Sequence, residues 1–391
     1  MKTERNLRLF KWEAFFYGFS PIYALFIVYL ARATGSWATA GLIIGLMGFA
    51  TTALEIPVGI FSDKKSRRLT MLSGYACYSA YTLMMASGGQ LGLTWIMFAS
   101  VAFYGIFRAA RSGTREAMLY ETLVKLKREN DFPVIYADTM FWERCGLILG
   151  YGLAAAMAYL ASLQAVMWME AVSPAGALFV VAAMAEPNAV KRDGGSPLDY
   201  LAKSLKKLAS DRKLREISYA EIWSEATIVA YTRTCGAYYA TLIPEWMVNI
   251  SRVAMQVCGA VGFKLARYTR RFGYFNMLLT SNITEMLVHG GAFFLNNFMT
   301  PFISSAALLT TGLRRTAQAS LIQQNLSPQH RTTIHSLISM ASGTAILILM
   351  WAIGLIADAS SIYWAMFAAL AARSGLVFIY WRLRRMYGSG K

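Results

Sequence analysis

About twelve apolar runs, each near the ~20 residues that a helix needs to cross a bilayer, constrain this chain more than any other feature. They predict an all-α integral membrane protein, because helices satisfy every backbone polar group inside hydrocarbon. Several runs contain isolated charges. The runs start near Phe10, Trp37, Leu69, Leu91, Val134, Ala165, Ile217, Trp246, Tyr274, Phe298, Thr333 and Ile362.

The composition agrees with a membrane protein. Hydrophobic residues make up 56% of the 391 residues and charged residues 15%, against about 25% charged residues in an average soluble domain. The net charge of +17 could indicate a nucleic-acid binder, but the cations lie in clusters between the apolar runs and form no continuous patch for a phosphate backbone. The four cysteines lie inside apolar runs without metal-ligand spacing, so we expect neither disulfides nor a metal site.

The basic clusters predict the orientation of the chain. They occupy both termini and alternate gaps between runs, whereas the intervening gaps are nearly free of cations. Cytoplasmic loops carry such an excess of Lys and Arg, so both termini are predicted to be cytoplasmic, in a bacterial-type inner membrane. The basic clusters are Lys2 to Lys11, Lys64 to Arg68, Lys125 to Arg128, Lys191 to Arg215, Arg267 to Arg271, Arg331 and Arg382 to Arg385.

The longest polar interval divides the chain into an N-terminal six-helix bundle at 1–185, a cytoplasmic linker at 186–216 and a C-terminal six-helix bundle at 217–391. Within the linker, leucines at helical spacing among lysines at 197–208 predict either an amphipathic helix on the cytoplasmic leaflet or a solvated tether. The loop at 262–271 occupies the same position in the second half as the loop at 59–68 in the first, but it lacks the acid. A degraded internal duplication would leave this pattern.

Four segments resemble one branch of the major facilitator superfamily of secondary transporters. The segment Glu55-Ile-Pro-Val-Gly59 resembles the end of its span 2, and Gly59 to Arg68 resembles the loop G-x-x-x-D-[RK]-x-G-[RK]-[RK] that follows, with Ser66 in place of a glycine. Arg111-Ser-Gly-Thr-Arg-Glu116-Ala-Met-Leu-Tyr120 resembles R-S-G-x-x-E-A-L-x-Y at the end of span 4. Ser327 to Ser336 resembles the loop between spans 10 and 11.

The resemblance implies twelve transmembrane helices in two six-helix bundles that rock about a central site. It also implies a cytoplasmic gate in which Asp63 contacts Arg111, with Arg108 one turn deeper, through a charge-assisted bond that breaks on opening. The remaining residues of this gating motif are Gly59, Lys64, Arg67, Arg68 and Glu116. For the cations Lys64, Lys65, Arg67 and Arg68, we expect a topology signal and lipid contact, with a specific contact as the alternative.

Ionisable residues inside the runs are candidates for substrate or proton coupling, because such groups are costly in a bilayer. Glu225 and Arg233 share one run, and Glu285 and His289 share one face of another at i, i+4 spacing. The family architecture adds the cavity-lining arginines Arg108 and Arg314 and counts against substrate contacts by Glu285 and His289. Structural pairing is the alternative for all of these, and for the charges nearer the helix ends, which are Glu13, Asp138, Glu221 and Arg315.

The predicted function is secondary active transport of a small organic solute, driven by protons. Drug-efflux-like export by antiport is the first interpretation, and uptake or facilitated diffusion of a metabolite is the second. A transport-inactive sensor or scaffold is the alternative of another class. No ATP-binding or hydrolytic motif occurs, so no enzyme activity and no cofactor are expected. The predicted partners are a small-molecule substrate, protons and membrane lipid, with no nucleic acid, and the chain is predicted to be a monomer.

Overall fold

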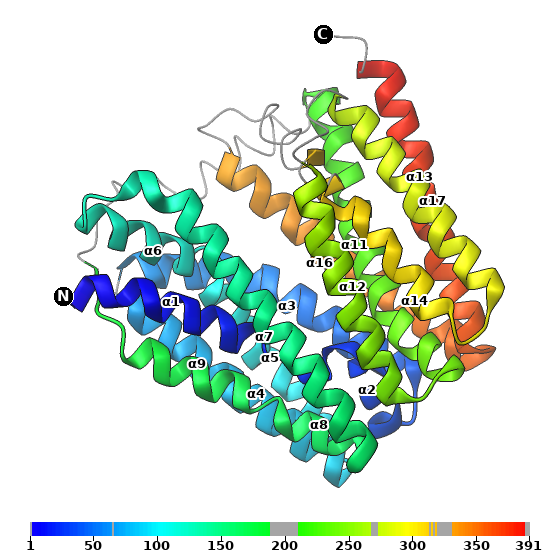
Figure 1. Ribbon diagram of the computed structural model, residues 1–391, viewed down its shortest axis with the longest axis horizontal. Coiled ribbons are helices and arrows are strands. Elements are labelled where there is room, and N and C mark those ends of the chain that lie inside the picture. Colours follow the sequence, from blue (N-terminus) through cyan, green and yellow to red (C-terminus); the bar gives the residue numbers. More distant parts are fainter. Residues whose placement is uncertain are drawn as a thin grey trace. The chain divides into compact units, whose positions relative to one another are not determined.

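A computed structural model describes residues 2–64, 66–187, 210–266, 273–312, 314–315, 317–318 and 331–387, and the regular structure of these residues is helical (Figure 1). The N-terminal elements are α1 (Lys2–Gly18), η1 (Pro21–Ala24), α2 (Phe26–Thr34), α3 (Trp37–Lys64), α4 (Arg67–Leu91), α5 (Thr94–Arg111), α6 (Thr114–Lys125), η2 (Glu129–Asp131), α7 (Phe132–Leu160), α8 (Leu163–Met169) and α9 (Val172–Ala182). The C-terminal elements are α11 (Arg212–Leu242), α12 (Glu245–Ala266), α13 (Tyr274–Leu295), α14 (Thr300–Ser305), η4 (Ala306–Thr310), α16 (Arg331–Ala359) and α17 (Ile362–Tyr387).

The chain forms two compact units, Met1–Arg192 and Asp193–Lys391. The predicted linker helix at 197–208, the basic loop at 267–271 and the stretch 327–330 lie outside the described residues. The domain boundaries at 185 and 217 stay a prediction.

In the first unit, α1 packs along α7 and α9 (Figure 1). Glycines make the contact between α1 and α7 close. A Cβ atom added to Gly18 would lie 2.0 Å from the carbonyl oxygen of Glu143, and one added to Gly146 would lie 2.0 Å from the carbonyl oxygen of Phe15. Small residues let helix backbones approach in this way within membranes. The contact brings the polar side chains of α1 and α7 together in the interior of the unit.

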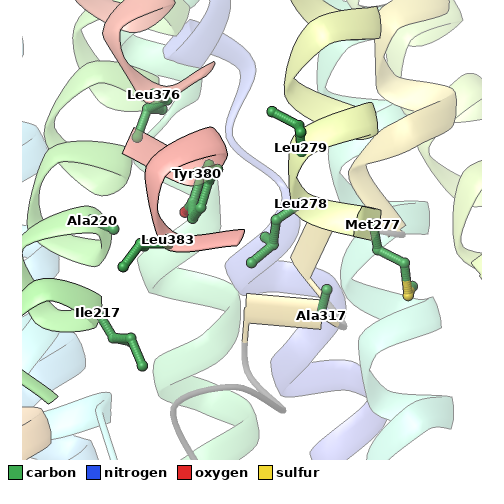
Figure 2. Close-up of a cluster of buried hydrophobic side chains, with 9 residues drawn as sticks. All are labelled: Ile217, Ala220, Met277, Leu278, Leu279, Ala317, Leu376, Tyr380 and Leu383. Carbon is green, nitrogen blue, oxygen red and sulfur yellow. The ribbon is translucent and has the colours of Figure 1, made fainter. Parts of the chain in front are cut away.

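In the second unit, α11 packs against α16 and α17, and α13 packs against α17. An apolar cluster fills the space between α11, α13, α17 and the helical residues that follow η4 (Figure 2). It lies toward the start of α11 and α13 and the end of α17. The apolar cluster consists of Ile217, Ala220, Met277, Leu278, Leu279, Ala317, Leu376, Tyr380 and Leu383.

Four described helical segments are long and apolar enough to cross a membrane: Trp37–Glu55, Leu163–Ala182, Leu337–Ala359 and Ile362–Tyr387. The pair Glu4–Ala24 and Phe26–Thr34, bent by 53°, adds a fifth if it forms one broken span. Other long helices, such as α11 with Glu221, Glu225 and Arg233, carry more charge within their length. Twelve crossings and cytoplasmic termini therefore stay predictions.

Candidate functional site

A buried ionic cluster joins α1, α4, α5, α6 and α7 of the first unit. Glu13 has no exposed surface. Its Oε1 accepts from Arg111 Nε at 3.0 Å and from the Tyr75 hydroxyl, and its Oε2 accepts from Arg115 Nε at 2.6 Å. Arg111 also contacts Glu143 at 3.4 Å. We call these five residues the Glu13 cluster. Two guanidinium groups face two carboxylates, so the cluster is balanced in charge.

Aromatic side chains lie near the two arginines at the end of α5, one of which belongs to the Glu13 cluster. The Arg111 guanidinium carbon lies 3.3 Å from the centroid of the Tyr17 ring, and Arg108 Nη1 donates to the Tyr17 hydroxyl. Tyr78 stacks on Phe107 with ring centroids 4.1 Å apart. Arg108 and Arg111, both near the end of α5, thus stand beside one aromatic side chain of α1 as well as beside the acids.

Glu170 connects two helix breaks in the same unit. It follows α8, just before α9, and it faces the interruption between α1 and α2. Its Oε1 accepts from the Ser20 and Tyr78 hydroxyls, both at 2.8 Å, and its Oε2 accepts from the backbone N–H of Ile22 at 3.3 Å. Because a broken helix leaves backbone groups unpaired, this carboxylate stabilises the break in the predicted span 1.

The loop after α3 is held by hydrogen bonds to the end of α9. Glu186 accepts from the Ser66 hydroxyl and from the backbone N–H groups of Arg67 and Arg68, at 2.9 and 3.0 Å. Arg68 in turn donates to the carbonyl oxygens of Val181 and Ala182. A carboxylate at a helix N-terminus and a cation at a helix C-terminus are both favourable pairings with the helix dipole. Arg67 and Arg68 therefore make specific contacts within the unit, in contrast to the lipid-contact interpretation.

The second unit contains another buried ionic cluster. Glu285 of α13 is 3% exposed. Its Oε1 accepts from Arg314 Nε at 3.2 Å and from the Thr310 hydroxyl at 3.3 Å, and its Oε2 accepts from Arg373 Nη2 of α17. Arg314 and Arg373 are 3% and 1% exposed. Ion pairs buried to this degree need good geometry to offset the loss of hydration.

A glutamine extends this cluster to α11. Arg314 Nη1 donates to Gln318 Oε1 at 3.3 Å, and Gln318 Nε2 donates to Glu221 Oε2. We call Glu221, Glu285, Arg314, Gln318 and Arg373 the Glu285 cluster. It links α11, α13, α17 and the helical residues after η4, and it borders the apolar cluster, since Glu221 follows Ala220 and Gln318 follows Ala317 (Figure 2).

The structure places the predicted gating residues as follows. The side chains of Asp63 and Lys64 lie outside the described residues, so the contact of Asp63 with Arg111 stays a prediction. Gly59 has open space where a Cβ atom would lie. Glu116 accepts from the Tyr136 hydroxyl at 3.0 Å, and Arg67 contacts Glu121 at 3.4 Å.

The predicted coupling residues divide into two groups. Glu285 and Arg314 form one ion pair, and His289 lies one turn beyond Glu285, 5% exposed, with its ring 4.5 Å from that of Tyr231. Glu225, by contrast, is exposed on α11, and among the described residues no ion pair joins it to Arg233. The structure thus pairs Glu285, which the family architecture counted against, with Arg314, which it favoured. Their roles in coupling stay predictions.

Several residues of the two clusters were not among the predicted site residues. The sequence signal was present for Glu13 and Arg373, because an ionisable side chain inside an apolar run is costly unless it is paired. Arg373 lies in the last run and Glu13 in the first, and both become central to a cluster. The missed residues are Glu13, Tyr75, Arg115, Glu143, Glu221, Gln318 and Arg373.

Comparison with solved structures identifies the fold. The nucleoside transporter NupG superposes with a TM-score of 0.78 and 13% identity over all of both chains, and a mutant of the same transporter gives 0.81 and 14% over 97% of this chain and 99% of that one. A D-xylose–proton symporter gives 0.75 and 11% over 98% of both chains. A bacterial homologue of the human lysosomal transporter Spinster gives 0.76 and 12% over 99% of this chain and 98% of that one.

This is the fold of major facilitator transporters. No family model and no curated protein matches the sequence. The neighbours are transporters and not enzymes, and a multi-pass membrane protein agrees with the apolar helices. Membership of the branch defined by the loop motifs stays a prediction.

Proposed function

We propose that this protein is a secondary active transporter that carries a small organic solute together with protons by alternating access. The observation that carries the proposal is the likeness of nearly the whole chain to transporters of known structure, at a TM-score of 0.81 over 97% of the chain. A further feature supports it. Each unit has a buried ionic cluster, and buried intramembrane charges are typical of ion and substrate pathways.

We further propose that the direction is uptake by symport. The sequence favoured export, but the comparisons give no support to efflux or antiport. Two neighbours are described as nucleoside transporters and one as a D-xylose–proton symporter. The solute class of this chain is accordingly proposed to be a small polar metabolite, and a bacterial-type inner membrane and a monomeric state complete the proposal.

Transport can be tested in proteoliposomes that contain the full chain and a pH-sensitive dye in the lumen. We expect one member of a panel of nucleosides, pentoses, hexoses and their phosphorylated or carboxylated forms to acidify the lumen when it is added outside. Glu285→Gln should abolish this signal, because it removes the acid that contacts both Arg314 and Arg373.

The matched control is Glu216→Gln, which removes an acid of α11 that pairs with Arg212 and Arg382 at the exposed end of the unit. It should keep the signal. Well-folded protein that moves neither protons nor labelled solute across the whole panel would favour the transport-inactive sensor or scaffold over our proposal.

A further inference from the structure

We propose that the Glu285 cluster is a linked binding site for one proton and one anionic group, with Glu221 taking the proton and Arg373 and Arg314 the anion. The inference deepens the proposed function and rests on it. It narrows the solute to one that carries a carboxylate or phosphate group.

The charge of the cluster is the first observation. In the Glu13 cluster two arginines face two carboxylates, Glu13 and Glu143. In the Glu285 cluster both Arg314 and Arg373 contact the carboxylate of Glu285, whereas the second acid, Glu221, reaches Arg314 through Gln318. A buried charge without a compensating partner is costly. The charge balance around the two arginines therefore depends on whether Glu221 is ionised.

Unused donors on Arg373 are the second observation. Its Nη2 binds Glu285, but Nε and Nη1 are buried without a hydrogen-bond partner among the described residues. His289, which is 5% exposed, also has an unpartnered Nδ1. Buried polar groups are nearly always paired, and a guanidinium fork matches a carboxylate or phosphate in a bidentate manner. The unpartnered Nε and Nη1 donors of Arg373 are therefore suited to an anionic ligand.

The bridge through Gln318 is the third observation. Its carbonyl oxygen faces Arg314 and its amide nitrogen faces Glu221, which is the orientation that a cation on one side and an ionised carboxylate on the other favour. When no ligand is bound, ionised Glu221 thus compensates the charge of the arginines indirectly, through Gln318. Protonated Glu221 carries no charge and cannot compensate them, so the excess positive charge of the arginines is then available to bind an anion.

The surroundings of Glu221 leave it as the acid best placed for this role. Glu225 lies one turn along α11 and is exposed, whereas Glu221 is half-buried. From α17 Tyr380 is the neighbouring titratable group, and from beyond η4 it is Arg314. The residues of α16 at 337–359 include one ionisable group, Asp358, close to the end of that helix. Tyr380 and Ala220, the residue before Glu221, both belong to the apolar cluster (Figure 2).

The sign of the linkage follows from these charges. An anion on Arg373 and Arg314 repels the negative charge of Glu221 and so favours its protonation. By reciprocity, protonation of Glu221 strengthens anion binding. Anion affinity should therefore rise as the pH falls, and the proton and the anion should bind together.

Matched solute pairs test the inference on the purified full chain in detergent micelles. We would titrate glucuronate against glucose, and benzoate against benzyl alcohol, and follow thermal unfolding by intrinsic tryptophan fluorescence. Both acids stay largely ionised at pH 5.5 and pH 8, since carboxylic acids titrate near 4. We expect at least one acid, and neither neutral partner, to stabilise the protein, with an apparent Kd roughly tenfold lower at pH 5.5 than at pH 8.

Three variants locate the linkage. Glu221→Gln imitates the protonated acid and should keep anion binding while reducing the ratio between the two pH values to about one. Glu216→Gln, the matched control, removes an acid at the exposed end of the unit and should leave the ratio unchanged. Arg373→Gln should abolish stabilisation by the acids, and Glu221→Gln remains informative if that variant fails to fold.

The proposal is overturned if neither acid stabilises the protein, if the neutral partners act equally, or if the pH ratio survives in Glu221→Gln or disappears in Glu216→Gln. Anion binding with the expected ratio but no flux in proteoliposomes would retain the linked site and reject transport. Flux of neutral solutes that persists in Glu221→Gln with unchanged pH dependence would retain transport and reject the linked site.

Discussion

Glu13 shows how strongly a single buried charge can depend on its partners. It accepts from Arg111, Arg115 and Tyr75 and has no contact with solvent. If the carboxylate becomes an amide, both arginines lose a negative partner, and only Glu143 remains near Arg111. Removing one member of a buried ion pair is more costly than replacing both members by apolar residues, because the remaining charge stays buried and uncompensated.

We therefore predict that Glu13→Gln lowers the free energy of unfolding by about 3–5 kcal/mol. Asp131→Asn removes an acid whose pair with Arg128 is nearly half exposed, and its cost should stay within about 1 kcal/mol. Denaturant titration of the purified protein in micelles, followed by tryptophan fluorescence, measures both. Equal effects of the two substitutions would show that the Glu13 cluster contributes no more than a surface pair.

For single residues, the sequence predicts which charged side chains are costly to bury but not which of them contact one another. Glu285 and Arg314 were candidates on separate grounds, and the structure joins them. Glu225 was a candidate on equal grounds and is exposed. Glu221 and Glu225 stand one turn apart on the same face of α11, yet Glu221 joins the Glu285 cluster through Gln318 and Glu225 does not. The difference depends on which neighbouring helix each turn meets, and the local sequence does not determine that.

At the scale of helices, the close contact of α1 with α7 depends on two glycines. The carbonyl oxygens of Glu143 and Phe15 occupy the places where Cβ atoms at Gly18 and Gly146 would lie. A backbone atom cannot move aside as a flexible side chain can. The same contact brings Glu143 within reach of Arg111, so helix spacing and charge pairing in this unit are coupled.

Gly146→Ala should accordingly lower the free energy of unfolding by about 1–3 kcal/mol, the usual cost of overpacking. The control is Gly152→Ala on the same helix, where an added Cβ meets no atom within 4 Å and alanine favours the helix by about 1 kcal/mol. Melting temperatures of the two variants in the same micelle give the comparison. A stable Gly146→Ala protein would mean that α1 and α7 can separate at little cost.

The helices themselves were more predictable than their contacts. Runs expected to start at Trp37, Tyr274 and Ile362 coincide with the first residues of α3, α13 and α17, because apolar length is a local property. The breaks after Gly18 and around Glu170 were not predicted, since each is stabilised by hydrogen bonds to residues far away in the sequence, such as that of Glu170 with Ile22.

At the scale of the whole molecule, the arrangement of basic gaps predicts which loops face the cytoplasm. The η2 turn lies in a gap with Lys125, Lys127 and Arg128, whereas the turn between α16 and α17 has no cation. We expect Glu129 on the cytoplasmic side and Ser360 on the outer side. Both residues are exposed, so a thiol placed at either position is open to modification.

The test uses single-cysteine proteins in which the four native cysteines are replaced by alanine. A membrane-impermeant maleimide added to intact cells should label Ser360→Cys and leave Glu129→Cys unlabelled, and inverted vesicles should give the opposite pattern. The reverse result would invert the topology, and labelling of both positions from one side would reject an odd number of crossings between them. The four native positions are Cys77, Cys145, Cys235 and Cys258.

The ratio of two guanidinium groups to one carboxylate around Glu285 has an electrical consequence. If the arginines take up a monoanion whenever Glu221 takes up a proton, the pair crosses the membrane with no net charge. A membrane potential of 100 mV, worth about 2.3 kcal/mol to each unit charge that crosses, would then do no work on the cycle. Accumulation of the solute would follow the pH gradient alone, and a potassium diffusion potential imposed with valinomycin would leave the uptake rate unchanged.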